Sequence, residues 1–155
     1  MTDRIDARLA DLGIELPGPY PPHDPLDAVV VHGGVARTSG QLPRLDGAVI
    51  CCGTLGIDVA VDDARAAARV SALNGLSVLR EALGSLDRVE RILSVTGYVA
   101  SAAGFHDQAA VIDGASAVLV EVFGDAGRHT RSAIGVAALP RGSAVELEIV
   151  AAVHE

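Results

Sequence analysis

Lysine is absent from this chain of 155 residues, and all 12 of its basic residues are arginines. The absence excludes the P-loop lysine and every mechanism that needs a Schiff base on lysine, pyridoxal-phosphate enzymes included. The chain also has a net charge of −8. Broad nucleic-acid surfaces need clustered Lys and Arg, so this balance argues against nucleic acid as a partner. Small anions bound by one or two arginines remain open.

Cysteine is scarce too, because the chain has only Cys51 and Cys52, which are neighbours. Side chains of adjacent residues usually point apart, so an ordinary loop-closing disulfide is not expected. We predict two reduced, partly buried thiols, as in intracellular proteins. The sequence also has no CxxC or HxxxH spacing, and a structural zinc site is therefore not predicted.

Long apolar runs are missing as well. No stretch approaches the roughly 18 uninterrupted apolar residues that a membrane helix needs. Residues 1–13 carry charges where a signal peptide has its apolar segment. We therefore expect a soluble cytoplasmic protein and no membrane partner.

The sequence does contain enough apolar material for one packed domain. Half of the residues are hydrophobic and the mean hydropathy is +0.38, well outside the range of disordered chains. Residues 4–13 predict a short helix, and the prolines clustered in residues 17–25 are typical of an extended arm. We divide the chain into an N-terminal helix and proline-rich arm, residues 1–27, and a domain of residues 28–155.

Two patterns predict the elements of that domain. β-Branched runs predict strands, and Gly33-Gly34 between the first two of them predicts a tight hairpin. Small and apolar residues at helical spacing predict a long helix that Asp62 or Asp63 caps and Gly84 closes. The expected strands are residues 28–32, 35–39, 48–52, 87–100, 132–139 and 144–154, and a second helix is expected over residues 105–123.

This order of elements, β-β-(β)-α-β-α-β-β, predicts an α/β (α+β) two-layer sandwich, a mixed sheet with two helices on one face. A doubly wound fold is the alternative, but it needs more strands than the sequence offers. Two helices cover one face of a sheet and leave the other face bare. In so apolar a chain we expect sheet-to-sheet oligomerisation to cover it.

Two charged residues lie in apolar strands, where charge is costly without a partner. Arg131 begins the run RSAIGVAAL, and Glu146 lies within AVELEIVAAV. A guanidinium grips a carboxylate with two hydrogen bonds, and a carboxyl group in apolar surroundings has a raised proton affinity that suits proton transfer. A buried structural ion pair, or two solvated strand residues, explains the same pattern.

The spacing of these two residues tests how the last two strands are arranged. In a plain hairpin centred on Arg141, Arg131 faces about residue 151, which leaves Glu146 roughly 17 Å away along the strand. Either these strands are not neighbours in that way, or Arg131 and Glu146 meet from different subunits. The second alternative gives the hypothesis of an intersubunit cleft.

Several motifs together resemble the RidA (YjgF-type) family. They are TSGQLP, the segment GASAVLVEVFGDAGRHTRSAIGVAALPRGSAVELEIVA, and within it the pattern R-S-x-x-x-V-x-x-L-P…V-E-x-E. The resemblance covers about residues 28–154. The helix VIDGASAVLVEVFG and the junction GRHTRS are similar to the less characterised branch of the family.

The resemblance implies a chorismate-mutase-like fold assembled as a homotrimer with three clefts between subunits. It also implies hydrolysis of reactive 2-imino and 2-enamino acids to 2-oxo acids and ammonia, or a related small-acid hydrolase activity, without a metal or organic cofactor. Arg131 matches the arginine that binds the substrate carboxylate, and Glu146 matches the glutamate that positions the attacking water. Gly40 and Ala133 match positions whose backbone contacts the ligand, and Ser39 lies beside them.

Three departures from the family pattern bear on the substrate. Leu26 stands where the family has a tyrosine, although Tyr20 lies nearby, and Ala133 replaces a cysteine. Asp113 stands at a helix position usually held by asparagine, where it adds negative charge near an anionic ligand. Two alternatives to the deaminase therefore stay open: a non-catalytic trimer that binds a small carboxylate and regulates a partner, and the endoribonuclease (L-PSP) or translation-inhibitor activity attached to some relatives.

Overall fold

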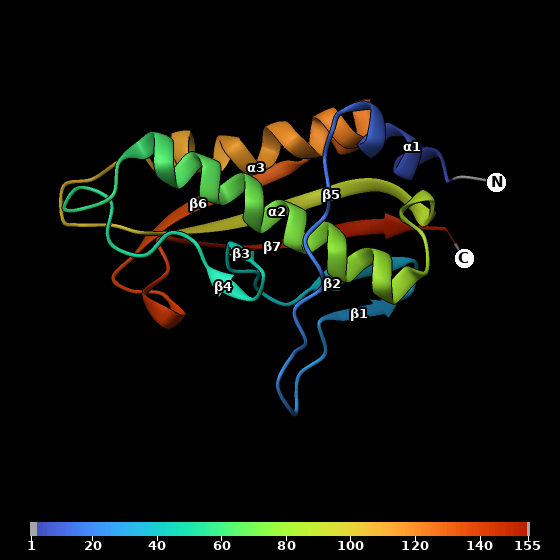
Figure 1. The fold of residues 1–155 in the computed structure, drawn as a ribbon, viewed down its shortest axis with the longest axis horizontal. Coiled ribbons are helices and arrows are strands. Elements are labelled where there is room, and N and C mark those ends of the chain that lie inside the picture. The colour runs from blue at the N-terminus through green and yellow to red at the C-terminus, as the bar shows by residue number, and fades with distance from the viewer. Residues whose placement is uncertain (1–2, 155) are drawn as a thin grey trace.

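The computed structural model describes residues 3–154, which form helices packed on a mixed sheet (Figure 1). The helices are α1 (Arg4–Asp11), α2 (Val61–Leu83) and α3 (Gln108–Phe123), with one-turn helices η1 (Leu86–Arg88), η2 (Gly124–Gly127) and η3 (Pro140–Gly142). The main sheet contains β1 (Val29–His32), β2 (Val35–Thr38), β5 (Val89–Ala100), β6 (Thr130–Val136) and β7 (Val145–Val153). A separate small hairpin is made of β3 (Arg44–Leu45) and β4 (Ala48–Val49).

The main sheet has the strand order β1-β2-β7-β5-β6. Only β5 and β6 run parallel, with α3 in the connection between them, and the other pairs are antiparallel. Helices α2 and α3 lie side by side over one face of this sheet (Figure 1). The predicted mixed sheet with two helices on one face is confirmed.

Strands β6 and β7 are not neighbours, because β5 lies between them. The same residue of β5, Val95, pairs with Arg131 of β6 on one side and with Ile149 of β7 on the other. This order answers the question that the spacing of Arg131 and Glu146 raised, since the two strands never form the plain hairpin. Strand β6 is instead the outer edge of the sheet.

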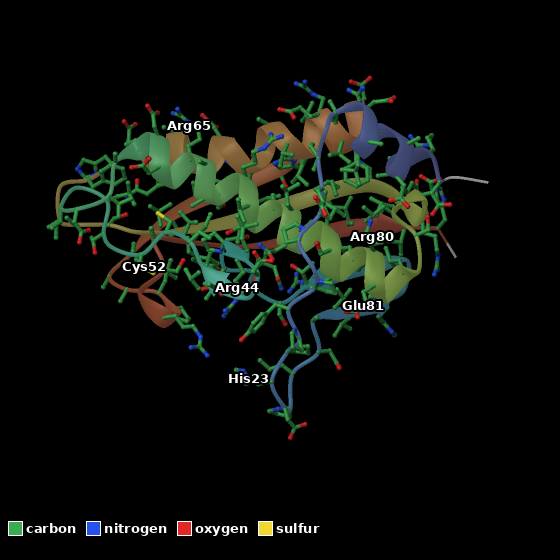
Figure 2. All side chains as sticks on the ribbon, viewed as in Figure 1. His23, Arg44, Cys52, Arg65, Arg80 and Glu81 are labelled. Atoms are coloured by element: carbon green, nitrogen blue, oxygen red, sulfur yellow. The ribbon has the colours of Figure 1, made fainter. Side chains whose placement is uncertain are left out.

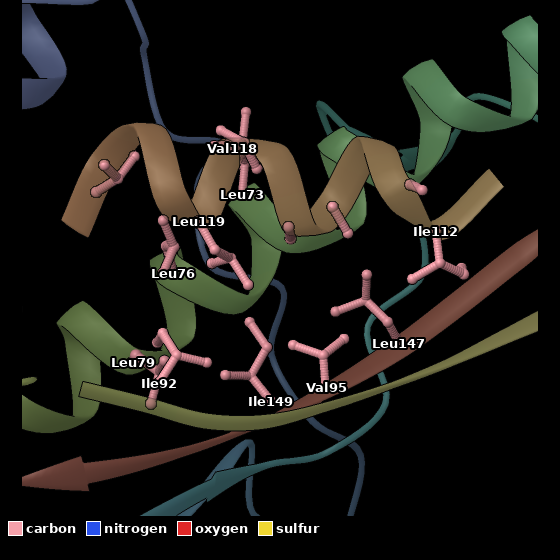
Figure 3. Close-up of a cluster of buried hydrophobic side chains, with 14 of the residues drawn as sticks. Leu73, Leu76, Leu79, Ile92, Val95, Ile112, Val118, Leu119, Leu147 and Ile149 are labelled. Carbon is pink, nitrogen blue, oxygen red and sulfur yellow. The ribbon is translucent and has the colours of Figure 1, made fainter. Parts of the chain in front are cut away.

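The core lies between α2, α3 and the inner face of the sheet (Figure 3). The predicted stripe on α2 is buried throughout, and its small residues let the helix approach β7 closely. At Gly75 an added Cβ would lie 2.6 Å from Cδ1 of Ile149. The buried stripe consists of Ala64, Ala68, Ser71, Ala72, Gly75, Leu76, Leu79 and Leu83.

Some predicted boundaries differ from the structure, each for a local reason. The N-cap of α2 is Ala60, while Asp62 and Asp63 lie in the first turn, where carboxylates interact favourably with the helix dipole. Helix α3 begins at Gln108 rather than at 105. The strand expected over residues 48–52 is reduced to β4, and Cys52 pairs with Ser143 only in an isolated bridge. A bulge between Ile92 and Ser94 interrupts the alternation of β5 and leaves Leu93 exposed.

The N-terminal helix packs on the same core as the sheet. Ile5 and Leu9 of α1 are buried, and the carboxylate of Asp87 accepts hydrogen bonds from the backbone N–H groups of Arg4 and Ile5 at 2.7 and 2.8 Å. The arm that follows is held against α2, because Ser77 Oγ donates to the carbonyl oxygen of Pro17. The arm thereby reaches the small hairpin and the end of β2.

Among residues 3–154, no helix is both long and apolar enough to span a bilayer. Both cysteines are free thiols. Cys51 is half-buried, as expected, and burial followed by the nearby Asp63 raises the pKa of its thiol. Cys52, in contrast, is exposed, because its loop turns its side chain away from the core.

Candidate functional site

The direction of the Glu146 side chain follows from its place in β7, where successive side chains point to opposite faces of the sheet. Its neighbours Val145 and Leu147 are fully buried against the helices, so the Glu146 side chain faces the other side of the sheet, beside Glu148 and the cross-strand partner Tyr98. Burial first, and then the Glu148 carboxylate, raise the pKa of Glu146. Burial and the same two carboxylates raise the pKa of Tyr98. This face of the sheet therefore carries a carboxyl group that retains its proton to a higher pH than an ordinary glutamate.

Glu146 lines a cavity of about 440 Å³ at the end of β2. The backbone of Gln41 pairs with Leu147 in both directions, at 2.7 and 3.1 Å, which brings the preceding residue, Gly40, against the Glu146 carboxylate. A Cβ at position 40 would overlap Oε1 of Glu146 and lie 2.9 Å from its carboxyl carbon. A side chain at position 40 would therefore displace the Glu146 carboxylate, so glycine here permits a close approach rather than a turn.

The other predicted residues of this cavity have defined places. Ser39 lines the cavity, but its hydroxyl donates to the carbonyl oxygen of Asp27 at 2.6 Å, so it serves the loop before β1. Tyr20 and Leu26 both line the cavity from the arm, so Tyr20 is available where Leu26 replaces the family tyrosine. A larger cavity, of about 650 Å³, lies between the arm and the small hairpin, but none of the predicted site residues lines it.

Arg131 lies on β6 and faces α3. Its Nη1 donates to Oδ1 of Asp113 at 2.8 Å and to Oγ of Ser116 at 3.1 Å, and its Nη2 donates to the carbonyl oxygen of Ala109 at 3.4 Å. The Arg131 side chain is 21% exposed and that of Asp113 is 61% exposed. Asp113 therefore acts as an ion-pair partner of the guanidinium, and an incoming carboxylate must share Arg131 with it.

His129 extends this network by two hydrogen bonds. Its Nδ1 lies 2.6 Å from the carbonyl oxygen of Gly127, and its Nε2 lies 2.9 Å from Oγ of Ser116. A carbonyl only accepts, so the ring proton is on Nδ1 and Nε2 accepts from the Ser116 hydroxyl. The Ser116 oxygen is then oriented to accept from Arg131. The network runs in one direction, from Arg131 through Ser116 and His129 to Gly127.

Within one chain, Arg131 and Glu146 lie on opposite faces of the sheet. Val95, the partner of Arg131, faces the helices, whereas Glu146 pairs with Tyr98, three residues further along β5. Ala133 lies on the same face as Arg131, two residues along β6, opposite Gly97. The predicted residues thus fall into two groups: a glutamate group (Glu146, Ser39 and Gly40) and an arginine group (Arg131, Asp113 and Ala133).

Ser116 and His129 are functional candidates that the sequence reasoning did not single out. Their signal was present. His129 lies just before β6, two residues from Arg131, and Asp113 and Ser116 are three residues apart on one helix face. The sequence did not show that α3 packs against β6, which brings these two pairs of residues together. In the part of the chain that is described, no group of three or more His, Cys, Asp or Glu side chains has the geometry of a metal site.

The fold defines a class of protein. A mixed sheet under two helices, with one parallel edge strand, is the YjgF/chorismate-mutase-like α+β architecture. The family described as "YjgF/chorismate_mutase-like, putative endoribonuclease" matches residues 6–153. The chain belongs to this family, as its motifs predicted.

Individual relatives agree with the assignment. Protein TCP17 of Trypanosoma cruzi is 42% identical over 146 residues, covering 94% of this chain and 91% of that protein. The structure of Atu1372 from Agrobacterium tumefaciens superposes with a TM-score of 0.90 at 36% identity, covering 97% of this chain and 92% of that one. YjgF of Escherichia coli superposes with a TM-score of 0.63 at 29% identity, covering 89% and 94%. The chain is thus more similar in structure to Atu1372 than to YjgF.

Proposed function

We propose that this protein hydrolyses reactive 2-imino and 2-enamino acids to 2-oxo acids and ammonia, in clefts between the subunits of a homotrimer. The observation that carries the proposal is the Glu146 carboxyl group, which has a raised pKa and lines a cavity against the backbone of Gly40. A carboxylate of raised basicity beside a cavity is suited to take a proton from water near neutral pH. No other described acidic side chain has both properties.

The chemistry needs little from the protein. An iminium carbon is already electrophilic, so the reaction requires a fixed carboxylate, a positioned water and a proton acceptor, without a metal or organic cofactor. The water oxygen forms a bond to the imine carbon while Glu146 takes one water proton. That proton passes to the amine nitrogen, the C–N bond breaks with its electron pair on nitrogen, and the remaining hydroxyl proton leaves with the ammonia. The product is a 2-oxo acid.

The arginine group completes this site in the proposed assembly. Arg131 and Glu146 lie on opposite faces of one sheet, so a substrate that touches both takes them from different copies of the chain. Arg131 lies on the edge strand β6, where a neighbouring copy can approach. The Arg131 guanidinium holds the substrate carboxylate and at the same time pairs with Asp113.

One relative supports a small carboxylate-bearing ligand. The structure of E. coli TdcF, which superposes with a TM-score of 0.60 at 25% identity, is described with bound serine. Serine carries the same 2-carboxylate and 2-nitrogen as a 2-imino acid. A ligand of this class is therefore our proposed partner.

The experiment is a coupled assay. A serine dehydratase generates 2-aminoacrylate, and the release of ammonia is followed with and without the protein. We expect the protein to accelerate ammonia release, Glu146→Gln to abolish the acceleration, and Glu81→Gln, an exposed change on α2 (Figure 2), to leave it intact. Ammonia release at the uncatalysed rate with folded wild-type protein would contradict the proposal.

Two other functions give different results in the same experiments. A trimer that only binds small carboxylates retains 2-oxobutyrate but releases no extra ammonia. An endoribonuclease, the activity in the family description, cleaves RNA in contaminant-free preparations. The net charge of −8 and the lack of lysine disfavour a long RNA substrate.

A further inference from the structure

The cavity of Glu146 also contains two arginines. Arg44, from the small hairpin, and Arg141, from η3, line it together with Glu146 and Gly40. In the described range 3–154 neither guanidinium forms an ion pair, although the chain has 20 acidic residues and only 12 basic ones. Two cations without carboxylate partners therefore face the same space as the glutamate.

Arg44 is held in a fixed orientation. Its guanidinium carbon lies 3.7 Å from the centre of the Tyr20 ring, and its Nη1 donates to the carbonyl oxygen of Gly47 at 3.0 Å. Stacking and one hydrogen bond fix the guanidinium plane, which leaves other N–H groups for a ligand. Figure 2 shows Arg44 at the small hairpin and His23, which also lines the cavity, on the arm.

Arg141 occupies an unusual backbone conformation. Its φ is 57° and its ψ is 20°, in the left-handed region, and Gly142 follows with a φ of 70°. A non-glycine residue is strained there, and such residues cluster at functional sites. Its guanidinium donates to no described residue. A long cationic side chain is thus kept at a position where glycine is less strained.

We propose that the site takes 2-imino acids that carry a second anionic group, rather than simple monocarboxylates. The inference rests on the proposed function. Arg131 of a neighbouring copy holds the carboxylate next to the imine carbon, and Arg44 and Arg141 hold the distal group, a carboxylate or a phosphate. A cavity of about 440 Å³ lies within the usual range of small-molecule sites and accommodates such a ligand.

Calorimetry with stable 2-oxo acids tests the proposal. The probes are 2-oxobutyrate, a monoanion, and two 2-oxo acids with a second anionic group, 2-oxoglutarate and 3-phosphohydroxypyruvate, which distinguish a distal carboxylate from a phosphate. We expect at least one of these two to bind 10-fold or more tightly than 2-oxobutyrate. Arg44→Gln and Arg141→Gly each reduce that preference, and the double variant reduces it to within twofold, because the Kd of the probe with the second anionic group rises far more than the Kd of 2-oxobutyrate. Arg4→Gln, an exposed charge removal on α1, leaves the preference intact.

Arg141→Gly protects the test against misfolding, because glycine suits the left-handed backbone and only the side chain is lost. If 2-oxobutyrate binds and the imine is hydrolysed but neither probe with a second anionic group binds more tightly, the inference fails and the proposed function stands. A preference that survives the double variant also overturns the inference. If no 2-oxo acid binds and no imine is hydrolysed, both fail.

Discussion

The Glu146 carboxyl group has two properties that follow from one cause. Burial, and then the neighbouring Glu148, raise its pKa, so the folded state holds this proton more tightly than the unfolded chain does. The stabilising effect of the proton is fully present below the unfolded pKa and is lost as pH rises through the folded pKa. As the pH rises through this raised pKa, ionisation of Glu146 therefore lowers the stability of the fold and supplies the base that the proposed reaction needs.

The variant Glu146→Gln separates the stability cost of the ionised carboxylate from its proposed role as a base. We expect Glu146→Gln to raise the melting temperature by a few degrees at pH 7 and to have no such effect at pH 4, since the amide mimics the protonated carboxyl group. Wild-type kcat/KM should fall with decreasing pH through the raised pKa, at a higher pH than an ordinary glutamate would produce. Thermal unfolding and a pH–rate profile measure the two effects, and an equal change in melting temperature at both pH values would contradict the assignment.

Arg131 is expected to act through its planar fork as well as through its charge. Arg131→Lys keeps the charge and loses the two-pronged geometry, whereas Arg131→Gln loses both. We expect Arg131→Gln to lower kcat/KM on 2-imino acids about 100-fold, equivalent to about 2.7 kcal/mol, and Arg131→Lys to retain less than a tenth of wild-type activity. Steady-state kinetics provide the measurement. The control is Arg80→Gln, which removes a half-exposed arginine of α2 that pairs with Asp6. An unchanged KM in Arg131→Gln would contradict the assignment.

His129 and Ser116 act on Arg131 as positioning residues in this scheme. Loss of the His129 acceptor frees the Ser116 hydroxyl to rotate, so we expect His129→Ala to raise KM about five- to tenfold with little change in kcat, near the value of one hydrogen bond. Gln places an acceptor near the former Nε2 and should restore most of the loss. In a Ser116→Ala background the His129→Ala change should have no further effect. Additive losses in the double variant would show that His129 acts independently of Ser116.

At the scale of elements, the sequence predicted those features that depend on neighbouring residues, such as turns and helix ends. Gly33 and Gly34 both have the positive φ that a two-residue hairpin demands, and Gly84 closes α2 in the left-handed region. The placement of β5 between β6 and β7 depends on contacts far apart in sequence, and no periodicity reveals it. For the same reason the sequence supplied Arg131 and Glu146 but not the packing of α3 that brings Ser116 and Asp113 to Arg131.

The contact between α2 and α3 depends on Gly114. A Cβ there would overlap the carbonyl oxygen of Arg65 and lie 2.9 Å from its carbonyl carbon, so two helix backbones must separate. We expect Gly114→Ala to lower the free energy of unfolding by about 1–3 kcal/mol, despite the better helix propensity of alanine. Gly75→Ala is the matched control, because its obstacle is the flexible tip of Ile149, and it should cost much less. Denaturant unfolding compares the two, and a neutral Gly114→Ala would contradict this account.

At the scale of the whole molecule, the proposed trimer makes a prediction that a single-chain site does not. Trimers of Arg131→Gln chains lack the arginine and trimers of Glu146→Gln chains lack the glutamate, so both are inactive. After the two are mixed and subunits exchange, a mixed trimer contains one cleft with an intact glutamate from one chain and an intact arginine from another. We expect part of the activity to return. The active species should have a mass of about 47 kDa, three times that of one chain. If exchanged trimers form and remain inactive, the two residues do not share a cleft.

The placement of Arg131 and Glu146 on opposite faces of one sheet has a kinetic consequence. In the proposed assembly, dilution dissociates the trimer and so destroys the active sites, in addition to lowering their concentration. Specific activity should then fall steeply once the protein concentration drops below that needed for association, and it should recover on reconcentration. The turnover per chain would thus depend on the protein concentration.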